Sequence, residues 1–272
     1  MILPGEIQSI AGKAMVRDSQ IEKDYIISWI AYGISNNPFL KESLIFKGGT
    51  VLKKVYFPDY RFSEDLDFTI NGKDFDIGTI KSAFNVLIEW VYEESRISLS
   101  IKDETQYETG NFNFYLLYTG PLGGAGANKD IKVDISQNEL IFNPPEEKRI
   151  INSYSDLDQK KYSILCYTLG EVMAEKMRSV MQRTAPRDIY DLWYLLEIEG
   201  LNIEDYIFAF QDKAAHKGYD PQQLIITVEQ KKNIFSKQWQ EHLANQMREI
   251  PDFNIVWREM GKHWRKFQKF LE

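Results

Sequence analysis

The periodicity of apolar residues changes part-way along the chain, and this change limits the folds that the sequence can adopt. Up to about residue 155, short apolar runs typical of strands alternate with segments whose apolar residues recur every three or four positions. Beyond that point, helical periodicity dominates. The sequence therefore predicts an α+β fold: a mixed sheet with flanking helices over residues 1–155, and an α-helical bundle over residues 156–272.

The first domain should contain at least two helices and several strands. One helix is expected to open at Ser19, because Ser19-Gln-Ile-Glu22 has the spacing of a capping box. The other predicted helices cover residues 79–92 here, and 169–182 and 189–197 in the second domain. The predicted strands cover residues 44–46, 66–70, 97–102, 111–118 and 131–135.

The composition excludes several classes of protein. With 43% hydrophobic and 27% charged residues, the 272-residue chain is typical of a soluble globular protein. No apolar run reaches the roughly 18 residues of a membrane helix, and the first residues do not resemble a signal peptide. The single cysteine, Cys166, cannot form an internal disulfide, and the three scattered histidines do not match a zinc site. We therefore expect a cytoplasmic location and no association with a membrane.

Two carboxylates lie in the second predicted strand. Side chains alternate along a strand, so Asp65 and Asp67 should share one face while Leu66 and Phe68 point into the core. Two like charges at this spacing repel each other unless a divalent cation lies between them. Mg²⁺, or Mn²⁺, would remove the repulsion and could bring a nucleoside triphosphate with it. On its own, however, an Asp-x-Asp pair is most often an ordinary solvent-exposed face.

A glycine pair precedes these carboxylates. Gly48 and Gly49 follow a predicted strand, where backbone N–H groups without a neighbouring Cβ can approach phosphate oxygens. Thr50 could add a hydroxyl ligand or cap the next helix. A glycine pair alone usually marks an ordinary turn, but its combination with the two aspartates and the intervening Lys53, Arg61 and Ser63 is much more specific.

This stretch resembles the AbiEii/AbiGii toxin family of nucleotidyltransferases, which share a polymerase-β-like core. The family pattern is Gly-Gly-Thr-x-Leu-x-Lys followed by Arg-x-Ser-x-Asp-hydrophobic-Asp. The matching positions are Gly48, Gly49, Thr50, Leu52, Lys53, Arg61, Ser63, Asp65 and Asp67. The resemblance implies a metal-dependent nucleotidyltransferase in which Asp65 and Asp67 bind the metal and act in catalysis. It also implies that Gly48, Gly49, Thr50, Lys53, Arg61 and Ser63 bind the nucleotide.

Such sites usually have a third carboxylate on a neighbouring strand. Asp134 lies in the alternating segment Ile131-Lys-Val-Asp-Ile135, with Lys132 on the same face, and is the candidate third metal ligand. The alternative is a hairpin strand whose outer face is exposed to water.

A second set of charged residues occurs on two predicted helices. Without the resemblance, we would interpret them as surface charges, with Arg187 and Asp191 forming an exposed i, i+4 ion pair. Related toxins are similar in carrying Glu-x4-Lys and Arg-Asp-x-x-Asp helices here. The resemblance implies that Lys176 contacts the triphosphate and that Asp191 orients Lys176 or the base. The residues expected around them are Glu171, Arg183, Arg187 and Asp188.

The resemblance also suggests partners. Family members look like the toxic half of type IV toxin–antitoxin or abortive-infection systems, and related toxins add nucleotides to the 3′ end of tRNA. This chain would then use a nucleoside triphosphate and a tRNA, and pair with a winged-helix antitoxin encoded nearby. The alternatives are transfer to a protein or small molecule, or a catalytically silent nucleotide-binding module.

The net charge of -7 requires any nucleic-acid partner to be met by a local basic patch. One candidate lies near the C-terminus, where cations alternate with Trp257, Trp264 and Phe267, which could stack on bases. An amphipathic helix with solvated lysines gives the same pattern. The cations are Arg258, Lys262, Arg265, Lys266 and Lys269.

Overall fold

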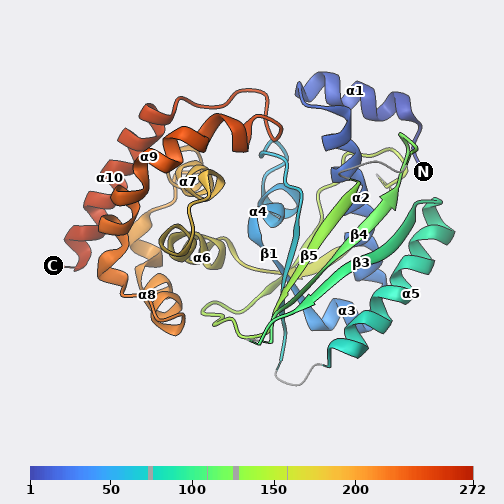
Figure 1. Cartoon of the computed structure of the whole chain (residues 1–272), viewed down its shortest axis with the longest axis horizontal. Helices are drawn as coiled ribbons and strands as arrows, with labels where there is room; N and C mark the ends of the chain where they lie inside the picture. Colours follow the sequence, from blue (N-terminus) through green and yellow to red (C-terminus); the bar gives the residue numbers. More distant parts are fainter. Residues whose placement is uncertain (73–75, 109, 125–128, 158, 272) are drawn as a thin grey trace. The chain divides into compact units, whose positions relative to one another are not determined.

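The computed structural model describes residues 1–72, 76–108, 110–124, 129–157 and 159–271 (Figure 1). These residues form two compact units, which are interleaved along the chain. The sheet unit comprises residues 1–139, 145–166 and 245–247. The helical unit comprises residues 140–144, 167–244 and 248–272.

The sheet unit is built on a mixed sheet of seven strands in the described residues, in the order β3-β4-β5-β2-β1-β7-β6. Two neighbouring pairs, β2 with β5 and β1 with β7, are parallel, and the other pairs are antiparallel. The strands are β1 (Leu44–Lys47), β2 (Leu66–Ile70), β3 (Ser98–Gln106), β4 (Phe112–Thr119), β5 (Asp130–Ser136), β6 (Glu146–Arg149) and β7 (Ser163–Cys166).

All five predicted strands are present, whereas β6 and β7 were not predicted. β6 consists of the charged residues Glu-Glu-Lys-Arg and lies at the edge of the sheet, so it carries no apolar alternation. β7 has only four residues and lies in the part of the chain that the sequence assigned to helices. Its buried Ile164 and Cys166 complete the sheet beside β1.

Helices pack against the sheet and against each other. The helices α2 (Asp18–Asn36) and α5 (Ile77–Ser95) approach closely at Gly33, where a Cβ would lie 2.9 Å from Cγ of Leu87. Phe84 packs edge-on against Phe114 of β4, with ring centroids 5.0 Å apart. The helices of this unit are α1 (Pro4–Ala14), α2 (Asp18–Asn36), α3 (Pro38–Ser43), α4 (Gly48–Val51), which continues as a π-helical turn (Leu52–Tyr56), and α5 (Ile77–Ser95).

The predicted capping box at the start of α2 is wrong. The helix begins at Asp18, and its N-cap, Arg17, makes no side-chain capping hydrogen bond. Glu22 is instead fully buried, where its carboxylate accepts a hydrogen bond from the Leu122 backbone N–H at 2.8 Å and lies 3.0 Å from Nζ of Lys129. Glu22 therefore binds Leu122 and Lys129 rather than its own helix end.

The helical unit contains five α-helices in its described residues. α6 covers the predicted range, and α7 begins three residues earlier than predicted, at Pro186. The bounds are α6 (Leu169–Gln182), α7 (Pro186–Trp193), α8 (Ile207–His216), α9 (Leu224–Leu243) and α10 (Phe253–Leu271). Shorter turns cover Tyr194–Ile198, Ile203–Tyr206 and Pro221–Gln223.

The predicted α+β architecture is confirmed, with a mixed sheet and flanking helices followed by a C-terminal helical region (Figure 1). Within the described residues, no helix has both the length and the apolar character needed to cross a bilayer.

Candidate active site

Three charged side chains occupy paired positions on three adjacent strands. Asp67 of β2 pairs with Asp134 of the parallel strand β5 on one side and with Lys47 of β1 on the other. Neighbouring strands lie about 4.8 Å apart, and paired residues project to the same face. Leu66 and Phe68, which flank Asp67, are fully buried, as predicted. The sheet therefore holds two carboxylates next to each other, with an ammonium group beside them.

Asp65 lies one residue before β2 rather than within it. Its backbone carbonyl accepts a hydrogen bond from the hydroxyl of Thr50 at 2.5 Å, and Thr50 is only 1% exposed. Thr50 thus links the first turn of α4 to the residue that leads into β2. The hydroxyl fixes the backbone of a candidate metal ligand and does not cap α4, whose N-cap is Lys47. The part that Thr50 would play in nucleotide binding stays a prediction.

Gly48 is shaped to accommodate Asp67. A Cβ at residue 48 would lie 2.2 Å from Oδ2 of Asp67, much closer than any normal contact. The φ angle of Gly48 is +77°, a conformation that residues with a side chain rarely adopt. Both features require glycine at the point where β1 ends and α4 begins.

Lys132 lies against the candidate third ligand. Its Nζ is 2.7 Å from Oδ2 of Asp134, and both side chains are about one-third exposed. Burial alone would lower the pKa of Lys132, but the hydrogen bond and negative charge of Asp134 raise it, with a further contribution from Asp65. Lys132 is therefore held in its charged form among the carboxylates.

The carboxylates have the chemistry of a site for a hard divalent cation such as Mg²⁺, which prefers oxygen ligands. In the described residues, however, no three His, Cys, Asp or Glu side chains are grouped closely enough to hold a metal ion. An ammonium group lies against Asp134 instead. A cation bound to Asp134 would therefore have to displace Lys132.

Sequence reasoning missed Lys47 as a site residue. It is 6% exposed, donates a hydrogen bond to Oγ of Ser136 at 3.2 Å and lies 3.9 Å from Oε1 of Glu139. In the sequence Lys47 is marked only by its position immediately before Gly48, and its pairing with Asp67 follows from the register of β1 and β2.

Lys53 and Arg61 bond to backbone or side chains elsewhere in the sheet unit. Nζ of Lys53 donates to the carbonyl of Pro58 at 2.5 Å, and burial is the main reason that its pKa is lowered. Nη1 of Arg61 donates to Oε1 of Gln246 at 2.8 Å, and Arg61 is 2% exposed. Ser63 is also buried, at 7% exposure. In this conformation Arg61 has a structural role.

Lys176, Asp188 and Asp191 form a buried charged cluster in the helical unit. Nζ of Lys176 lies 2.8 Å from Oδ1 of Asp188 and 2.6 Å from Oδ2 of Asp191, and both carboxylates are fully buried. Arg183 adds two hydrogen bonds to Asp188, of 2.6 and 3.0 Å. Lys176, Asp188 and Asp191 are not the exposed surface charges that the sequence alone suggested, whereas Arg183 is about half exposed. The roles that the family resemblance implies for Lys176 and Asp191 remain predictions.

The charges in this cluster decide the protonation state of Asp188. Its burial would raise the pKa of the carboxyl, but the positive charges of Lys176 and Arg183 outweigh that effect and lower the pKa below its ordinary value. Asp188 therefore stays ionised, and Lys176 lies between its carboxylate and that of Asp191.

Residues 31–272 match the family described as "Nucleotidyl transferase AbiEii toxin, Type IV TA system". The chain belongs to the AbiEii toxin family. It is accordingly a nucleotidyltransferase, and the type IV toxin–antitoxin systems of this family imply an antitoxin partner and a nucleoside triphosphate substrate. No curated protein matches the sequence.

The fold of this AbiEii-family chain is similar to those of solved structures. MenT4, a nucleotidyltransferase toxin from Mycobacterium tuberculosis, is similar with a TM-score of 0.66 at 16% identity, covering 100% of this chain and 90% of MenT4. JHP933 from Helicobacter pylori is similar with a TM-score of 0.58 at 18% identity, covering 93% of this chain and 94% of JHP933.

Glu171, the first residue of the Glu-x4-Lys motif in this AbiEii-family chain, binds backbone rather than Lys176. Its carboxylate accepts hydrogen bonds from the N–H groups of Phe142 and Asn143, at 3.1 and 2.9 Å. It also lies 2.5 Å from Nζ of Lys213, which donates to the carbonyl of Leu140. Glu171 and Lys213 together hold the segment 140–144 on α6 and α8.

Proposed function

We propose that this chain is a metal-dependent toxin that transfers a nucleotide from a nucleoside triphosphate to an RNA acceptor, the 3′ end of tRNA. The observation that carries the proposal is the pairing of Asp67 with Asp134 on β2 and β5, next to the glycine that Asp67 requires at residue 48. This arrangement concentrates negative charge at one place on a sheet, where phosphate chemistry needs a cation.

In the proposed reaction, the acceptor hydroxyl oxygen forms a bond to the α-phosphorus. The bond from that phosphorus to the bridging oxygen breaks, pyrophosphate leaves, and the hydroxyl proton passes to solvent. Mg²⁺ or Mn²⁺ held by Asp65, Asp67 and Asp134 would lower the proton affinity of the hydroxyl and neutralise charge on the phosphates. The protein mainly positions the reacting groups.

The nucleotide would be held by backbone and cationic groups. Gly48 and Gly49 offer N–H groups at the start of α4, and the carboxylates of Asp188 and Asp191 hold the ammonium group of Lys176 in place for the triphosphate. In this role Asp191 positions Lys176, as their 2.6 Å contact supports. Lys53, Arg61 and Ser63 complete the proposed binding set, and Lys53 would first leave the carbonyl of Pro58.

A winged-helix antitoxin and a cytoplasmic location complete the proposal. A toxin that modifies tRNA must act where tRNA is used, and an antitoxin must limit that activity in the same compartment. The family description, which places its members in type IV toxin–antitoxin systems, supports both points.

The test is a transfer assay with purified protein, Mg²⁺, total cellular RNA and each α-labelled nucleoside triphosphate in turn, with Asp67→Ala as the inactive control. We expect label in tRNA-sized RNA with the wild-type protein and none with the variant or with chelator. Label in a protein band would contradict the RNA acceptor, and magnesium-dependent nucleotide binding without transfer to any acceptor would contradict catalysis. Nucleotide transfer that persists in the presence of a chelator would contradict the proposed dependence on a divalent metal ion.

A further inference from the structure

The final helix, α10, presents a stripe of positive charge. Its cations are spaced by four, three, one and three residues, and at 100° per residue these positions fall within one arc of the helix surface. All five are exposed. We call them the α10 stripe: Arg258, Lys262, Arg265, Lys266 and Lys269.

The opposite side of α10 is buried in the helical unit. Trp257, Trp264 and Phe267 are 8%, 4% and 1% exposed. The expectation that these aromatic rings could stack on bases is therefore wrong, since they form the core against which the helix packs. Among the aromatic residues of α10 that the structure describes, only Phe270, near its end, is exposed, so α10 offers a partner mainly charge.

Most of the stripe has no acidic partner. Among the described residues, Arg258, Arg265, Lys266 and Lys269 form no salt bridge, and Lys262 lies 3.6 Å from Glu197. This is notable in a chain with a net charge of -7, in which many other lysines are paired with carboxylates. Unpaired positive charge is thus concentrated on one helix face.

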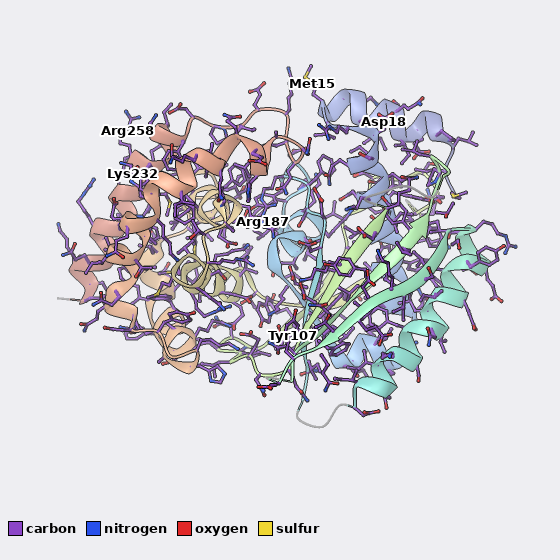
Figure 2. The ribbon with its side chains drawn as sticks, in the orientation of Figure 1. Met15, Asp18, Tyr107, Arg187, Lys232 and Arg258 are labelled. Carbon is purple, nitrogen blue, oxygen red and sulfur yellow. The ribbon has the colours of Figure 1, made fainter. Side chains whose placement is uncertain are left out.

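A neighbouring helix extends the positive surface. Lys232 of α9 lies over the ring of Trp257, 5.5 Å from its centroid, next to the start of the stripe. Figure 2 shows Lys232 and Arg258 close together on the outer side of α9 and α10. The patch therefore spans two packed helices, which hold it rigidly.

We propose that the α10 stripe binds the phosphate backbone of the RNA acceptor, an inference that rests on the RNA-directed function proposed above. From Arg258 to Lys269 the stripe is about 16 Å long at the rise of an α-helix, which is long enough for several consecutive phosphates. The bound partner would be recognised by charge and not by base sequence.

Two other kinds of partner fit the surface less well. A helix that lies on a membrane must offer its apolar face to lipid, and here that face is buried in the protein. Protein interfaces are depleted of lysine at their centres, whereas the stripe contains three lysines within eight residues. A polyphosphate chain matches the charge, the length and the exposure together.

The experiment measures binding of labelled total tRNA to the full chain over a range of salt concentrations. The test variant is Arg258→Gln/Arg265→Gln/Lys269→Gln. The control, Lys13→Gln/Arg17→Gln/Lys161→Gln, removes the same charge from exposed positions in the sheet unit that form no salt bridge with any residue that the structure describes. Each phosphate contact contributes about 0.7 to 0.9 to the slope of log K against log salt concentration. We expect the test variant to lose about 2 to 3 of slope and about 100-fold of affinity at 0.1 M salt, while the control stays near wild type.

Three outcomes would contradict RNA binding by the α10 stripe. They are an unchanged salt-dependence slope in the test variant, an equal loss of tRNA affinity in both triple variants, and tighter binding of the protein to anionic vesicles or an acidic protein than to tRNA. Transfer to RNA is measured in parallel. If the test variant transfers nucleotides with an unaltered KM for RNA, RNA binding by the α10 stripe is rejected and the proposed function is retained. If tRNA binding depends on the α10 stripe but no nucleotide is transferred to RNA, RNA binding by the stripe is supported and the proposal that RNA is the acceptor is rejected.

Discussion

The carboxylate of Asp67 fills the space that a side chain at residue 48 would need, with its Oδ2 only 2.2 Å from the position of a Cβ there. Gly48→Ala must therefore move Asp67 or the backbone, which also has a φ of +77°. A displacement of about 1 Å at a reacting centre can cost about 100-fold in rate. We expect a loss of that size in nucleotide transfer, measured with the labelled-nucleotide assay.

Gly12→Ala is the matched control for this substitution. Gly12 lies within α1, and nothing is within 4 Å of a Cβ built there. It should leave transfer unchanged and should raise the melting temperature slightly, because alanine favours the helix. Equal activity in both variants would show that the contact between Gly48 and Asp67 does not matter for the reaction.

Lys132 and a divalent cation would compete for Asp134. The ammonium group lies 2.7 Å from Oδ2 of Asp134 and must leave before a cation can bind there. Lys132→Gln should therefore lower the Mg²⁺ concentration that gives half-maximal transfer. A magnesium titration of wild type, Lys132→Gln and Asp134→Asn tests this, with Asp134→Asn expected to raise the requirement. A higher magnesium requirement in Lys132→Gln would instead indicate that Lys132 assists the substrate.

Removal of Lys176 leaves two buried carboxylates without their shared cation. Breaking a buried ion pair from one side costs about 3 to 5 kcal/mol, so Lys176→Met should lower the free energy of unfolding at pH 7 by about this amount. Urea unfolding measures the change, with Lys237→Met on the exposed side of α9 as the control.

The same variant should recover part of its stability in acid. In the wild type, the lowered pKa of Asp188 gives stability that is complete above its unfolded pKa of about 3.8 and is lost as the pH falls further. Without Lys176, only Arg183 opposes the effect of burial, so the pKa of Asp188 should rise relative to wild type and protonation in acid should relieve part of the uncompensated charge. A difference between wild type and variant that does not shrink between pH 7 and pH 4 would contradict the account.

Glu171 should control the segment 140–144. Gln at this position has one oxygen in place of two, so it cannot accept from both Phe142 and Asn143 as the carboxylate does. We expect faster amide hydrogen exchange at Phe142 and Asn143 in Glu171→Gln and a loss of about 1.5 to 3 kcal/mol in stability. Exchange at other amides of α6 should change only through the global loss. Unchanged protection at Phe142 and Asn143 would contradict the proposed anchoring.

His263 makes the stability of the helical unit sensitive to mild acid. Burial lowers its pKa, an effect that the hydrogen bond to Glu197 only partly offsets, and its buried Nδ1 has no hydrogen-bond partner in the described residues. Because the folded pKa is below the unfolded value of about 6.5, this contribution is complete above pH 6.5 and is lost as the pH falls through the folded pKa. His263→Gln should flatten the melting temperature between pH 7.5 and pH 5, and an equally steep profile would exclude His263 as the cause.

The fold was largely predictable because the spacing of apolar residues along the sequence indicates which side of each strand or helix is buried. β2 and β5 alternate apolar and polar residues, and α5 has the three-to-four spacing of a helix with one buried face. β6 was not predictable in this way, since its four charged residues form an edge strand that is defined by its pairing with β7. Pairing between distant segments leaves no local pattern.

The candidate site was predictable in its residues more than in their contacts. The motif singled out Asp67, and the alternation of residues 131–135 singled out Asp134 as the candidate third ligand; the register brings the two side by side. Sequence could not show that Lys132 would pair with Asp134 or that Lys47 would lie beside Asp67, because both depend on strand register. It also could not show that Arg61 bonds to Gln246, which lies 185 residues away.

That last contact shows that the sheet unit includes a short segment from far along the chain. The chain leaves this unit after Cys166 and returns for residues 245–247, where Gln246 accepts a hydrogen bond from Arg61 and its carbonyl accepts one from the Phe62 N–H. A gene fragment encoding only residues 1–166 would leave a buried guanidinium without this partner, next to the strand that bears Asp67. The residues leading into β2 are thus held in place by a segment that follows them by more than 180 positions, so the sheet unit closes only when residues 245–247 have folded back onto it.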